Sequence, residues 1–307
     1  MKIIKQPCKN DFLIGSVVAI GNFDGVHVGH QKILTTLRDI SQKLNIPSVV
    51  IIFNPHPRVF FSEYHKVFPI TSFTTQALLI KKHTVEYIYH LDFDYKICNL
   101  CATQFVKNIL LDKLNMKTLV VGRDFCFGKN RAGNIQVLKQ LSSYLGFDMI
   151  LIDDVCVHGE KVSSSLVRKY LQCGKITKAK RLLGSCYQIA GVVTQGHKRS
   201  NVINTPTANI DLKEALVPIK GVFAVTVEGL DRKYYGVANI GCHALTLGVT
   251  KSLLEVHIID FCQNIYGKYL TINFEYKIRD GIKLTDTDKL QQQIYDDIVV
   301  VKDFFDI

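Results

Sequence analysis

The stretch AIGNFDGVHVGHQKIL, residues 19–34, joins an apolar run to an amphipathic one and contains three glycines and two histidines. The apolar run reads as a buried strand over residues 17–21. The apolar residues that follow it recur at helical spacing: Ile33, Leu34, Leu37, Ile40 and Leu44. A helix that starts directly after a strand directs its free N–H groups to the carboxyl edge of the sheet, where α/β folds bind anions. The stretch therefore predicts an anion site in an α/β domain.

Three kinds of site compete for this stretch: a phosphate cradle, a metal site and a tight turn that happens to contain histidines. It has neither the Gly-Lys-Ser/Thr of a P-loop nor a GxGxxG pattern. His27, Gly29 and His30 instead form HxGH, with both imidazoles at the helix start and a glycine that leaves room for a ligand. Zinc would require a third ligand and prefers other spacing. The pattern favours stabilisation of a phosphoryl group in transfer.

The first half of the chain alternates between apolar runs and helical patterns. Strands are expected within residues 47–54, 118–122 and 147–155, with a helical stretch over residues 103–114. Continuous Val/Ile runs between helices are typical of a parallel sheet covered on both faces. We therefore expect an α/β, Rossmann-like first domain.

The second half reads as a series of short strands with turn signals between them. They fall within residues 187–196, 221–230, 233–241, 253–261 and 268–278. This pattern predicts an antiparallel barrel or sandwich. A helix over residues 286–305 follows, and its apolar residues form one stripe: Leu290, Ile294, Ile298 and Val301. The predicted domains are residues 1–185 and 186–307.

The charge of the chain is uneven. Its net charge is +11, but residues 1–185 hold 25 Lys and Arg against 13 Asp and Glu, whereas residues 186–307 hold 13 against 14. A basic first half suits an anionic ligand such as a nucleotide, and a lysine-rich solvated surface is the alternative. Aromatic residues are not interleaved with basic ones as in nucleic-acid readers, so no nucleic-acid partner is expected.

The sequence also predicts a cytoplasmic location without a membrane partner. No apolar run reaches the roughly 20 residues that span a bilayer, and residues 1–15 lack the apolar core of a signal peptide. Nine irregularly spaced cysteines favour reduced thiols. Cys98 and Cys101 have CxxC spacing but no matching second pair, so ordinary thiols are favoured over zinc.

Four segments resemble one family. The segment GNFDGVHVGHQ looks like the first signature of the nucleotidylyltransferase superfamily, in the longer form of bacterial bifunctional riboflavin kinase/FAD synthetases. Three segments follow in the family's order: the PHP segment IIFNPHPRVFF, the flavin-side signature VGRDFCFGKNRAGN and the ISSTxxR-type motif KVSSSLVRKYLQCGKI. The resemblance spans residues 14–305 and implies the reaction of FMN with ATP to give FAD and pyrophosphate, by in-line attack without a covalent intermediate.

The resemblance implies roles for residues of the first domain. His27 and His30 would stabilise the transition state, with Mg²⁺ sharing the charge, and Arg168 would grip the triphosphate. The implied ATP-binding residues are Gly21, Phe23, Asp24, Gly29, Ser164 and Ser165. The implied flavin-binding residues are Phe53, Pro55, His56, Asp124, Phe125 and Phe127. Structural alternatives are a helix cap for the serines, a stiff loop for the PHP segment and core packing for the aromatic rings.

Residues 188–307 resemble the riboflavin kinase module. Their segment TPTANI contains PTAN, in which the family uses Thr207 and Asn209 for Mg²⁺ and ATP. In LLEVHIIDF, a period of two puts Glu255 and His257 on one face, and the opposite face takes Leu254, Val256 and Ile258. Glu255 is thereby aimed where a general base for the riboflavin 5′-hydroxyl would lie, and a solvated strand face is the alternative.

The second domain departs from the family pattern at several positions. The family pattern has a Gly-Arg pair and a Gly-Phe/Tyr pair where this chain has Ser200-Asn201 and Asn204-Thr205. It has Arg-Pro-Thr where this chain has His243-Ala244-Leu245, and Gly281 stands in place of the Glu that ends an expected RDE. Fewer glycines and arginines mean fewer phosphate contacts. The interpretations left open are a bifunctional enzyme, an FAD synthetase with a vestigial kinase domain, a nucleotidylyltransferase of another acceptor, and a flavin-binding regulatory module.

Overall fold

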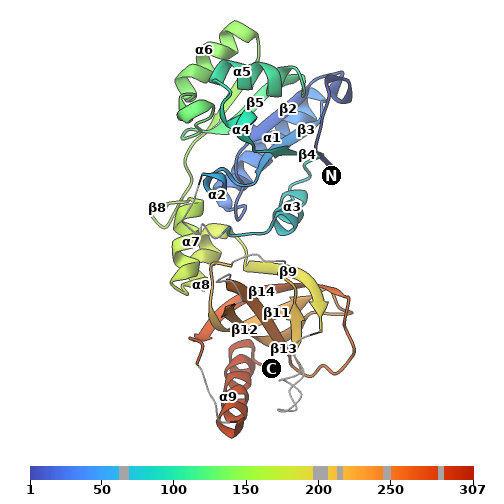
Figure 1. The fold of residues 1–307 in the computed structure, drawn as a ribbon, viewed down its shortest axis with the longest axis vertical. Helices are drawn as coiled ribbons and strands as arrows, with labels where there is room; N and C mark the ends of the chain where they lie inside the picture. The colour runs from blue at the N-terminus through green and yellow to red at the C-terminus, as the bar shows by residue number, and fades with distance from the viewer. Residues whose placement is uncertain (62–68, 196–206, 213–216, 245–249, 283–286) are drawn as a thin grey trace. The chain divides into compact units, whose positions relative to one another are not determined.

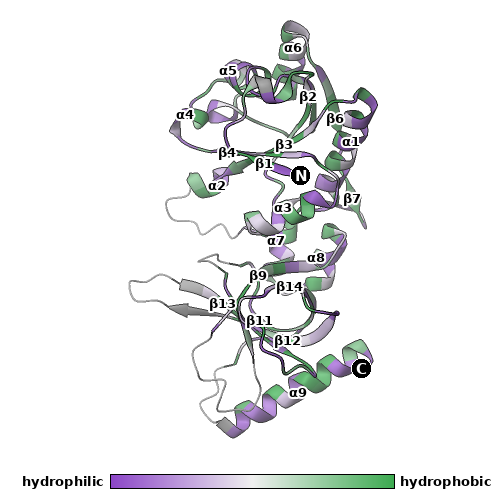
Figure 2. Ribbon diagram, turned by 90° about the vertical axis from the view of Figure 1, so that its right-hand side faces the viewer, coloured by the Kyte–Doolittle hydropathy of each residue, from purple (hydrophilic) through white to green (hydrophobic). Residues whose placement is uncertain are grey.

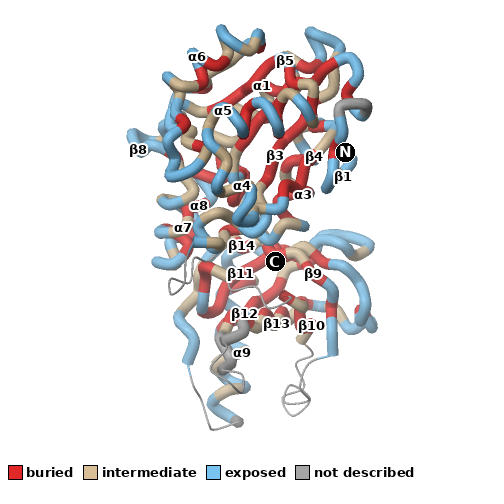
Figure 3. The backbone as a smooth tube through the Cα atoms, turned by 45° about the horizontal axis from the view of Figure 1, so that its top comes forward, coloured by how far each residue is buried: buried red, intermediate tan, exposed pale blue. Residues whose placement is uncertain are grey.

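The computed structural model describes residues 1–61, 69–195, 207–212, 217–244, 250–282 and 287–307 (Figure 1). The chain forms two compact units. The first comprises Met1–Val67 and Gln76–Val162, and the second comprises Phe68–Thr75 and Ser163–Ile307. In both units the buried residues concentrate on the strands (Figure 3). No helix in the described parts of the chain is long and apolar enough to cross a membrane.

The first unit contains a six-stranded parallel sheet in the order β1-β4-β3-β2-β5-β6. All five residues of β2 are buried, as are the first five of β3, because a parallel sheet of this kind is covered on both faces. The predicted α/β fold class is confirmed. Two of the strands, β1 and β4, were not predicted from the sequence. The strands are β1 (Lys2–Ile4), β2 (Ser16–Ile20), β3 (Ser48–Asn54), β4 (Tyr87–Asp92), β5 (Met116–Gly122) and β6 (Asp148–Ile152).

Helices fill the connections between these strands. The helical stretch expected over residues 103–114 is a short α-helix that continues as a π-helix, η2 (Val106–Leu111). A small hairpin of β7 (Cys156–Val157) and β8 (Glu160–Lys161) follows β6. The helices are η1 (Lys9–Phe12), α1 (Val28–Leu44), α2 (Pro57–Phe60), α3 (Phe73–Lys81), α4 (Tyr95–Cys98), α5 (Ala102–Phe105), η3 (Lys129–Arg131) and α6 (Ile135–Leu145).

The strand order reverses between β2 and β5. From β2 the chain moves through β3 to β4 on one side, and it continues through β5 to β6 on the other. In open α/β sheets, ligands bind in the crevice beyond the carboxyl ends of the strands at this switch point. The turn of residues 21–27 and the loop of residues 122–128 therefore border the expected site.

The second unit contains a closed antiparallel barrel in the order β10-β13-β12-β11-β14-β9, which confirms the predicted barrel. Period-two burial of β9 and β14 separates an interior from an exterior face. The strands are β9 (Tyr187–Thr194), β10 (Ala208–Ile210), β11 (Gly221–Glu228), β12 (Tyr234–Ala244), β13 (Thr250–Ile258) and β14 (Tyr269–Arg279).

The closing helix α9 (Thr287–Phe305) packs on the outside of this barrel. Its Val301 is fully buried against Val222, Ala224 and Val237, and Ile298 packs on the same cluster. Figure 2 shows both hydrophilic and hydrophobic residues along α9, of which Asp297 is buried whereas Val299 and Val300 are exposed. Arg279 of β14 makes two bonds to buried Asp297, at 2.8 and 2.7 Å. A buried, bidentate ion pair of this kind ties the helix to the barrel.

Two further helices, α7 (Ser164–Gln172) and α8 (Ile176–Leu183), belong to the second unit. They pack on each other, and α8 packs on β9 and β14. Lys180 of α8 forms an ion pair with Glu275 of β14 at 2.7 Å. The longer stretch of this unit begins at Ser163. The domain boundary that the sequence places after residue 185 stays a prediction.

Candidate active sites

The histidine of the turn that begins α1 serves as the helix cap. His27 has an extended backbone, and its Nδ1 accepts the backbone N–H of His30 at 3.2 Å. A side-chain acceptor at this position satisfies one of the N–H groups that the first helical turn leaves free. The cap therefore fixes the His27 ring at the positive end of the helix.

The two imidazole rings are stacked. The His27 and His30 centroids are 3.6 Å apart with an interplanar angle of 13°. A side chain at Gly29 would start 3.2 Å from the His27 ring, so the ring would have to shift by a few tenths of an ångström to admit one. The HxGH spacing thus brings the two rings together. The space beside Gly29, which the sequence predicts to be open for a ligand, adjoins the His27 ring.

Burial keeps both histidines neutral. His27 is 6% exposed, and burial lowers its pKa to about 4. The pKa of His30 lies well below 6.5 because of burial and the neighbouring His27. Since Nδ1 of His27 accepts a hydrogen bond, the proton of its neutral ring lies on Nε2. Nδ1 of His30 is buried and has no hydrogen-bond partner within the described residues.

The other predicted ATP-binding residues of this turn lie around the histidine pair. The Phe23 ring is fully buried with its centroid 5.1 Å from that of His30, and Asp24 is 4% exposed. A side chain at Gly21 would start 3.2 Å from the Phe23 ring. The structure gives these residues a packing role in the turn, and their contact with ATP stays a prediction.

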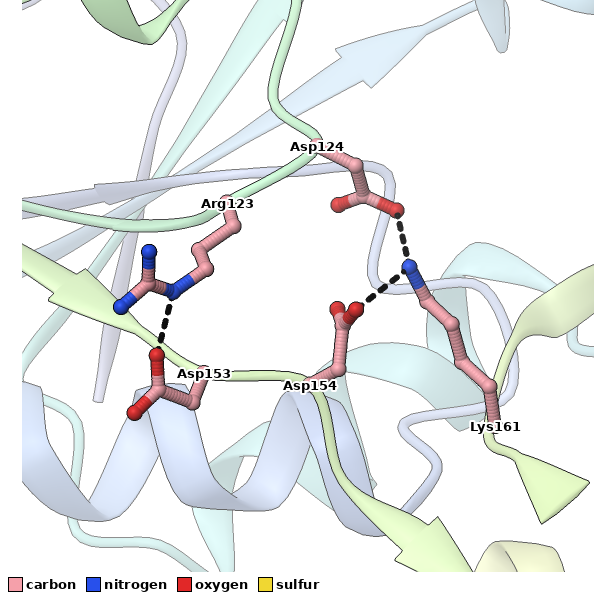
Figure 4. Close-up of polar contacts among 5 residues, drawn as sticks. All are labelled: Arg123, Asp124, Asp153, Asp154 and Lys161. Atoms are coloured by element: carbon pink, nitrogen blue, oxygen red, sulfur yellow. Dashed lines mark hydrogen bonds and ion pairs between the residues drawn. The ribbon is translucent and has the colours of Figure 1, made fainter.

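A cluster of charged residues occupies the carboxyl ends of β5 and β6 (Figure 4). Lys161 lies 3.4 Å from Asp124 and 2.8 Å from Asp154, and Arg123 pairs with Asp153. Asp124 also raises the pKa of His27, as a cause smaller than burial. The switch point therefore brings His27 and Asp124 together, although about 100 residues of sequence separate them.

The predicted flavin-binding aromatic rings lie at the ends of β3 and β5. Phe125 and Phe127 are stacked with centroids 5.4 Å apart. Phe127 is 6% exposed in the core, whereas Phe125 and Phe53 are half-buried at its border. A flat ring that bound here would reach Phe125 before Phe127, and the flavin contacts themselves stay a prediction.

The PHP segment forms a helix start rather than a loop. The Asn54–Pro55 peptide is cis, and Nδ1 of His56 accepts the N–H of Arg58 at 3.0 Å, which caps α2. His56 thus caps its helix as His27 caps α1.

The serines of the ISSTxxR-type motif lie at the predicted helix start, in the second unit. Ser163 caps α7 by accepting the N–H of Leu166 at 3.2 Å. Ser164 and Ser165 form the first turn of α7, and Arg168 lies one turn further. The predicted helix start is confirmed, and the phosphate contacts of these residues stay predictions.

The barrel places the predicted kinase residues in one row. Asn209 of β10 lies opposite Glu255 of β13, and Asn239 of β12 lies opposite Glu255 on the other side. Directly opposed residues share one face of a sheet. The predicted alternation along β13 is confirmed, because Glu255 and His257 are half-buried and the residues between them are buried.

Thr207 directly precedes β10 and lies two residues before Asn209. Its hydroxyl is buried and has no hydrogen-bond partner within the described residues. A cavity of about 330 Å³ reaches Thr207 and is bordered by residues 261–266. Two oxygen donors that leave room for substrate phosphates suit Mg²⁺. The described part of the chain holds no group of three or more His, Cys, Asp or Glu side chains placed to bind a metal.

Comparisons with known proteins match both units. The family model of FAD synthetase matches residues 9–166, and that of riboflavin kinase matches residues 183–305. A protein of Haemophilus influenzae named bifunctional riboflavin kinase/FMN adenylyltransferase is 37% identical and is covered over 96% of both chains. The chain belongs to the bifunctional riboflavin kinase/FAD synthetase family.

Further relatives of this family carry the same name. One from Buchnera aphidicola of Schizaphis graminum is 37% identical over 95% of both chains, and one from Escherichia coli K12 is 35% identical over 95% of this chain and 93% of its own. A solved structure from Streptococcus pneumoniae, titled a macrolide-efflux protein, aligns with a TM-score of 0.83 and 30% identity over 98% of both chains. The fold of this family member is therefore found in a solved structure.

Most departures from the family pattern lie outside the described residues. This holds for Ser200-Asn201, Asn204-Thr205 and Leu245, and for the side chains of His243 and Ala244. Gly281 is described and exposed, and a side chain there would meet nothing within 4 Å. The backbone at Gly281 therefore does not require glycine.

Two polar residues beside the predicted synthetase and kinase sites were not identified from the sequence. Asn239 lies opposite Glu255, and Gln76 of α3 binds the carbonyl of Asn22 at the histidine turn. Asn239 could have been found from the strand pattern once the register was known. No local signal identifies Gln76, because its partner lies 54 residues away.

Proposed function

We propose that the first unit transfers the adenylyl group of ATP to FMN, giving FAD and pyrophosphate, and that the barrel phosphorylates riboflavin to FMN with ATP. Membership in the bifunctional family supports both reactions. The substrates are then small molecules, ATP, FMN and riboflavin. The cytoplasmic location and the absence of nucleic-acid and membrane partners stay predictions.

The stacked, neutral histidine pair at the start of α1 carries the proposal for FAD synthesis. The FMN phosphate attacks the α-phosphorus of ATP in line, and negative charge grows on the phosphoryl oxygens and the departing pyrophosphate. The Nε2–H of His27 donates to that charge, at the positive end of the helix. The His30 ring, which is stacked on that of His27, helps to stabilise the same charge. The triphosphate is bound by Arg168, Ser164 and Ser165.

The remaining assigned residues of the first unit bind the two substrates. Gly21, Phe23, Asp24 and Gly29 shape the turn against ATP. The flavin ring lies against the half-buried aromatic residues, and the residues proposed to bind FMN are Phe53, Pro55, His56, Asp124, Phe125 and Phe127. Their position at the carboxyl edge of the sheet, next to the histidine turn, supports this assignment.

The row on the barrel carries the proposal for the kinase. Glu255 takes the proton of the riboflavin 5′-hydroxyl as that oxygen attacks the γ-phosphorus of ATP. Thr207, with its buried hydroxyl, and Asn209 would hold Mg²⁺ together with the ATP phosphates. The ion supplies neutralisation of phosphate charge in this site.

One incubation series tests both reactions. The purified chain is given ATP and Mg²⁺ with either riboflavin or FMN, and the flavin products are separated by chromatography. We expect FAD from FMN, and both FMN and FAD from riboflavin. His30→Ala should abolish FAD formation while FMN still forms from riboflavin. Normal FAD output from His30→Ala would refute the role of the histidine pair.

The same series separates the alternatives. FAD formation from FMN, with no FMN formed from riboflavin, would identify an FAD synthetase with a vestigial kinase domain. Consumption of ATP to pyrophosphate without FAD, in the presence of another phosphate acceptor, would identify a different nucleotidylyltransferase. Flavin binding without either product would identify a regulatory module.

A further inference from the structure

The turn between β2 and α1 departs from ordinary backbone geometry at three residues. The φ angles are 46° at Phe23, 81° at Gly25 and 42° at Val26. Glycine adopts such angles freely, but a bulky or β-branched residue rarely does. Backbone of this kind persists only where the surrounding structure holds it. The turn therefore needs support from outside its own residues.

Two glutamine side chains support the turn at its two ends. Gln76 of α3 is 6% exposed, and its Nε2 donates to the carbonyl oxygen of Asn22 at 2.5 Å. Gln31, in the first turn of α1, donates from Nε2 to the carbonyl oxygen of Val26 at 2.9 Å. One carbonyl belongs to the peptide plane before Phe23, and the other to the plane before His27. The two bonds therefore orient the planes on either side of the unusual residues.

The orientation of these planes decides where the imidazole rings lie. Phe23 follows the first plane, and its buried ring lies against that of His30. His27 follows the second plane, caps α1 and stacks on His30. Rotation of the second plane would move the His27 ring, and rotation of the first would move the Phe23 ring that lies against His30. An uncharged amide holds the turn without adding a charge beside the rings.

We propose that Gln76 and Gln31 are positioning residues for adenylyl transfer, which rests on the function proposed above for the first unit. They hold the peptide planes that place His27 and His30, and they do not touch the substrates. Their amide donors, rather than their bulk, do this work. A side chain at position 76 that keeps a donor should therefore replace glutamine, and one that lacks a donor should not.

The test compares donors with non-donors of similar size. Gln76→Met removes the donor without adding charge, Gln76→His keeps an N–H donor that is uncharged at pH 8, and Gln42→Met makes the first change at an exposed position of α1. For FMN adenylylation we expect Gln76→Met to lower kcat by about 10- to 100-fold, because small displacements of reacting groups cost rate, with KM for ATP and FMN within about threefold of the wild type. Gln31→Met should act in the same direction.

Rescue and an internal control separate positioning from general loss of structure. Gln76→His should recover kcat to within about threefold of the wild type at pH 8, and Gln42→Met should match the wild type. Riboflavin phosphorylation by the barrel of the same chain should stay unchanged in every variant. The proposal is overturned if Gln76→Met keeps the wild-type kcat, or if Gln76→His is as slow as Gln76→Met.

A measurement that needs no activity distinguishes failure of this proposal from failure of the proposed function. The N–H of Val26 donates to the carbonyl of Phe23 at 3.0 Å inside the turn. Hydrogen exchange at Val26 should become at least about tenfold faster in Gln76→Met and return to the wild-type rate in Gln76→His, with amides of β2 unchanged. Unchanged exchange in Gln76→Met overturns the positioning role even if the wild-type chain makes no FAD.

Discussion

The histidine turn of the first unit and the polar row of the barrel are supported by the rest of the chain in different ways. At the turn, His27 caps its helix and stacks on His30, and two carbonyls of the turn accept hydrogen bonds from glutamine side chains. On the barrel, Asn209 and Glu255 are held in register by regular strand pairing.

The difference shows two ways of preparing a site for phosphate chemistry. The turn is an irregular backbone that bonds to other segments and must be held in place, so its side chains are arranged before any ligand binds. The row stands on regular strands that fix the spacing of its side chains, so it needs no bonds from other side chains to keep that spacing.

The largest expected effect tests the row. Glu255→Gln keeps the size of the side chain and removes the base, so riboflavin phosphorylation should fall by about 100- to 10,000-fold. FAD formation from supplied FMN should stay at the wild-type level, because that reaction is assigned to the other unit. Both rates are measured by chromatography of the flavins.

Glu228→Gln supplies the matched control for this change. Glu228 is exposed on β11, and it accepts a bond from Asn273 at 3.1 Å. This variant should phosphorylate riboflavin like the wild type. Equal rates in the Glu228 and Glu255 variants would remove Glu255 from the reaction and weaken the contrast between the two regions.

The next largest effect is expected at the ion pair that ties α9 to the barrel. Asp297→Ala leaves the partly buried Arg279 without its partner, and loss of one member of a buried pair costs about 3–5 kcal/mol. Urea unfolding of the barrel should show this loss. The neighbouring Asp296→Ala removes only an exposed contact with Gln292 and should cost below about 0.5 kcal/mol. Similar losses in both variants would contradict the anchoring role of the pair.

The third prediction tests the neutral histidines. Because the pKa of His27 is about 4 in the folded chain and about 6.5 when unfolded, the unfolded chain takes up a proton first as the pH falls. The contribution of His27 to stability is full above pH 6.5 and is lost between pH 6.5 and 4. The total loss is about 3 kcal/mol, of which roughly 2 kcal/mol has gone by pH 5.

Urea unfolding of the first unit at pH 7.5 and pH 5 measures this dependence. His27→Asn keeps a side-chain acceptor at the helix cap but has no titrating ring, so its stability should fall less between the two pH values. An equal pH dependence in the variant and the wild type would show that the His27 ring is not kept neutral by burial.

The smallest effect is expected at the rim of the first site. Lys161 is 47% exposed, and its partners Asp124 and Asp154 are exposed to a similar or greater degree. Water and salt therefore screen its ion pairs. Lys161→Met should lower the unfolding free energy by at most about 1 kcal/mol, and 1 M salt should abolish the difference. A loss as large as that of Asp297→Ala would contradict the distinction between exposed and buried pairs.

Local sequence patterns predicted most of the elements because each depends on neighbouring residues. The strand before His27, the helix after it, the cap at Ser163 and the alternation around Glu255 all follow from short-range periodicity and capping. The short strand β1 was missed and the π-helical η2 was simplified to an ordinary helix, since three residues carry little pattern and a single π-helical segment within a helical stretch has no separate sequence signal.

The sequence by itself determined the fold class and the family, because motifs of this kind require particular side chains at fixed spacing, and the residues that it assigns to the two sites stay predictions. Tertiary structure alone decided that Asp124 lies near His27, that Asn209 and Asn239 flank Glu255, and that Gln76 holds the turn. Each of these depends on strand order or register, which bring together segments that share no local signal.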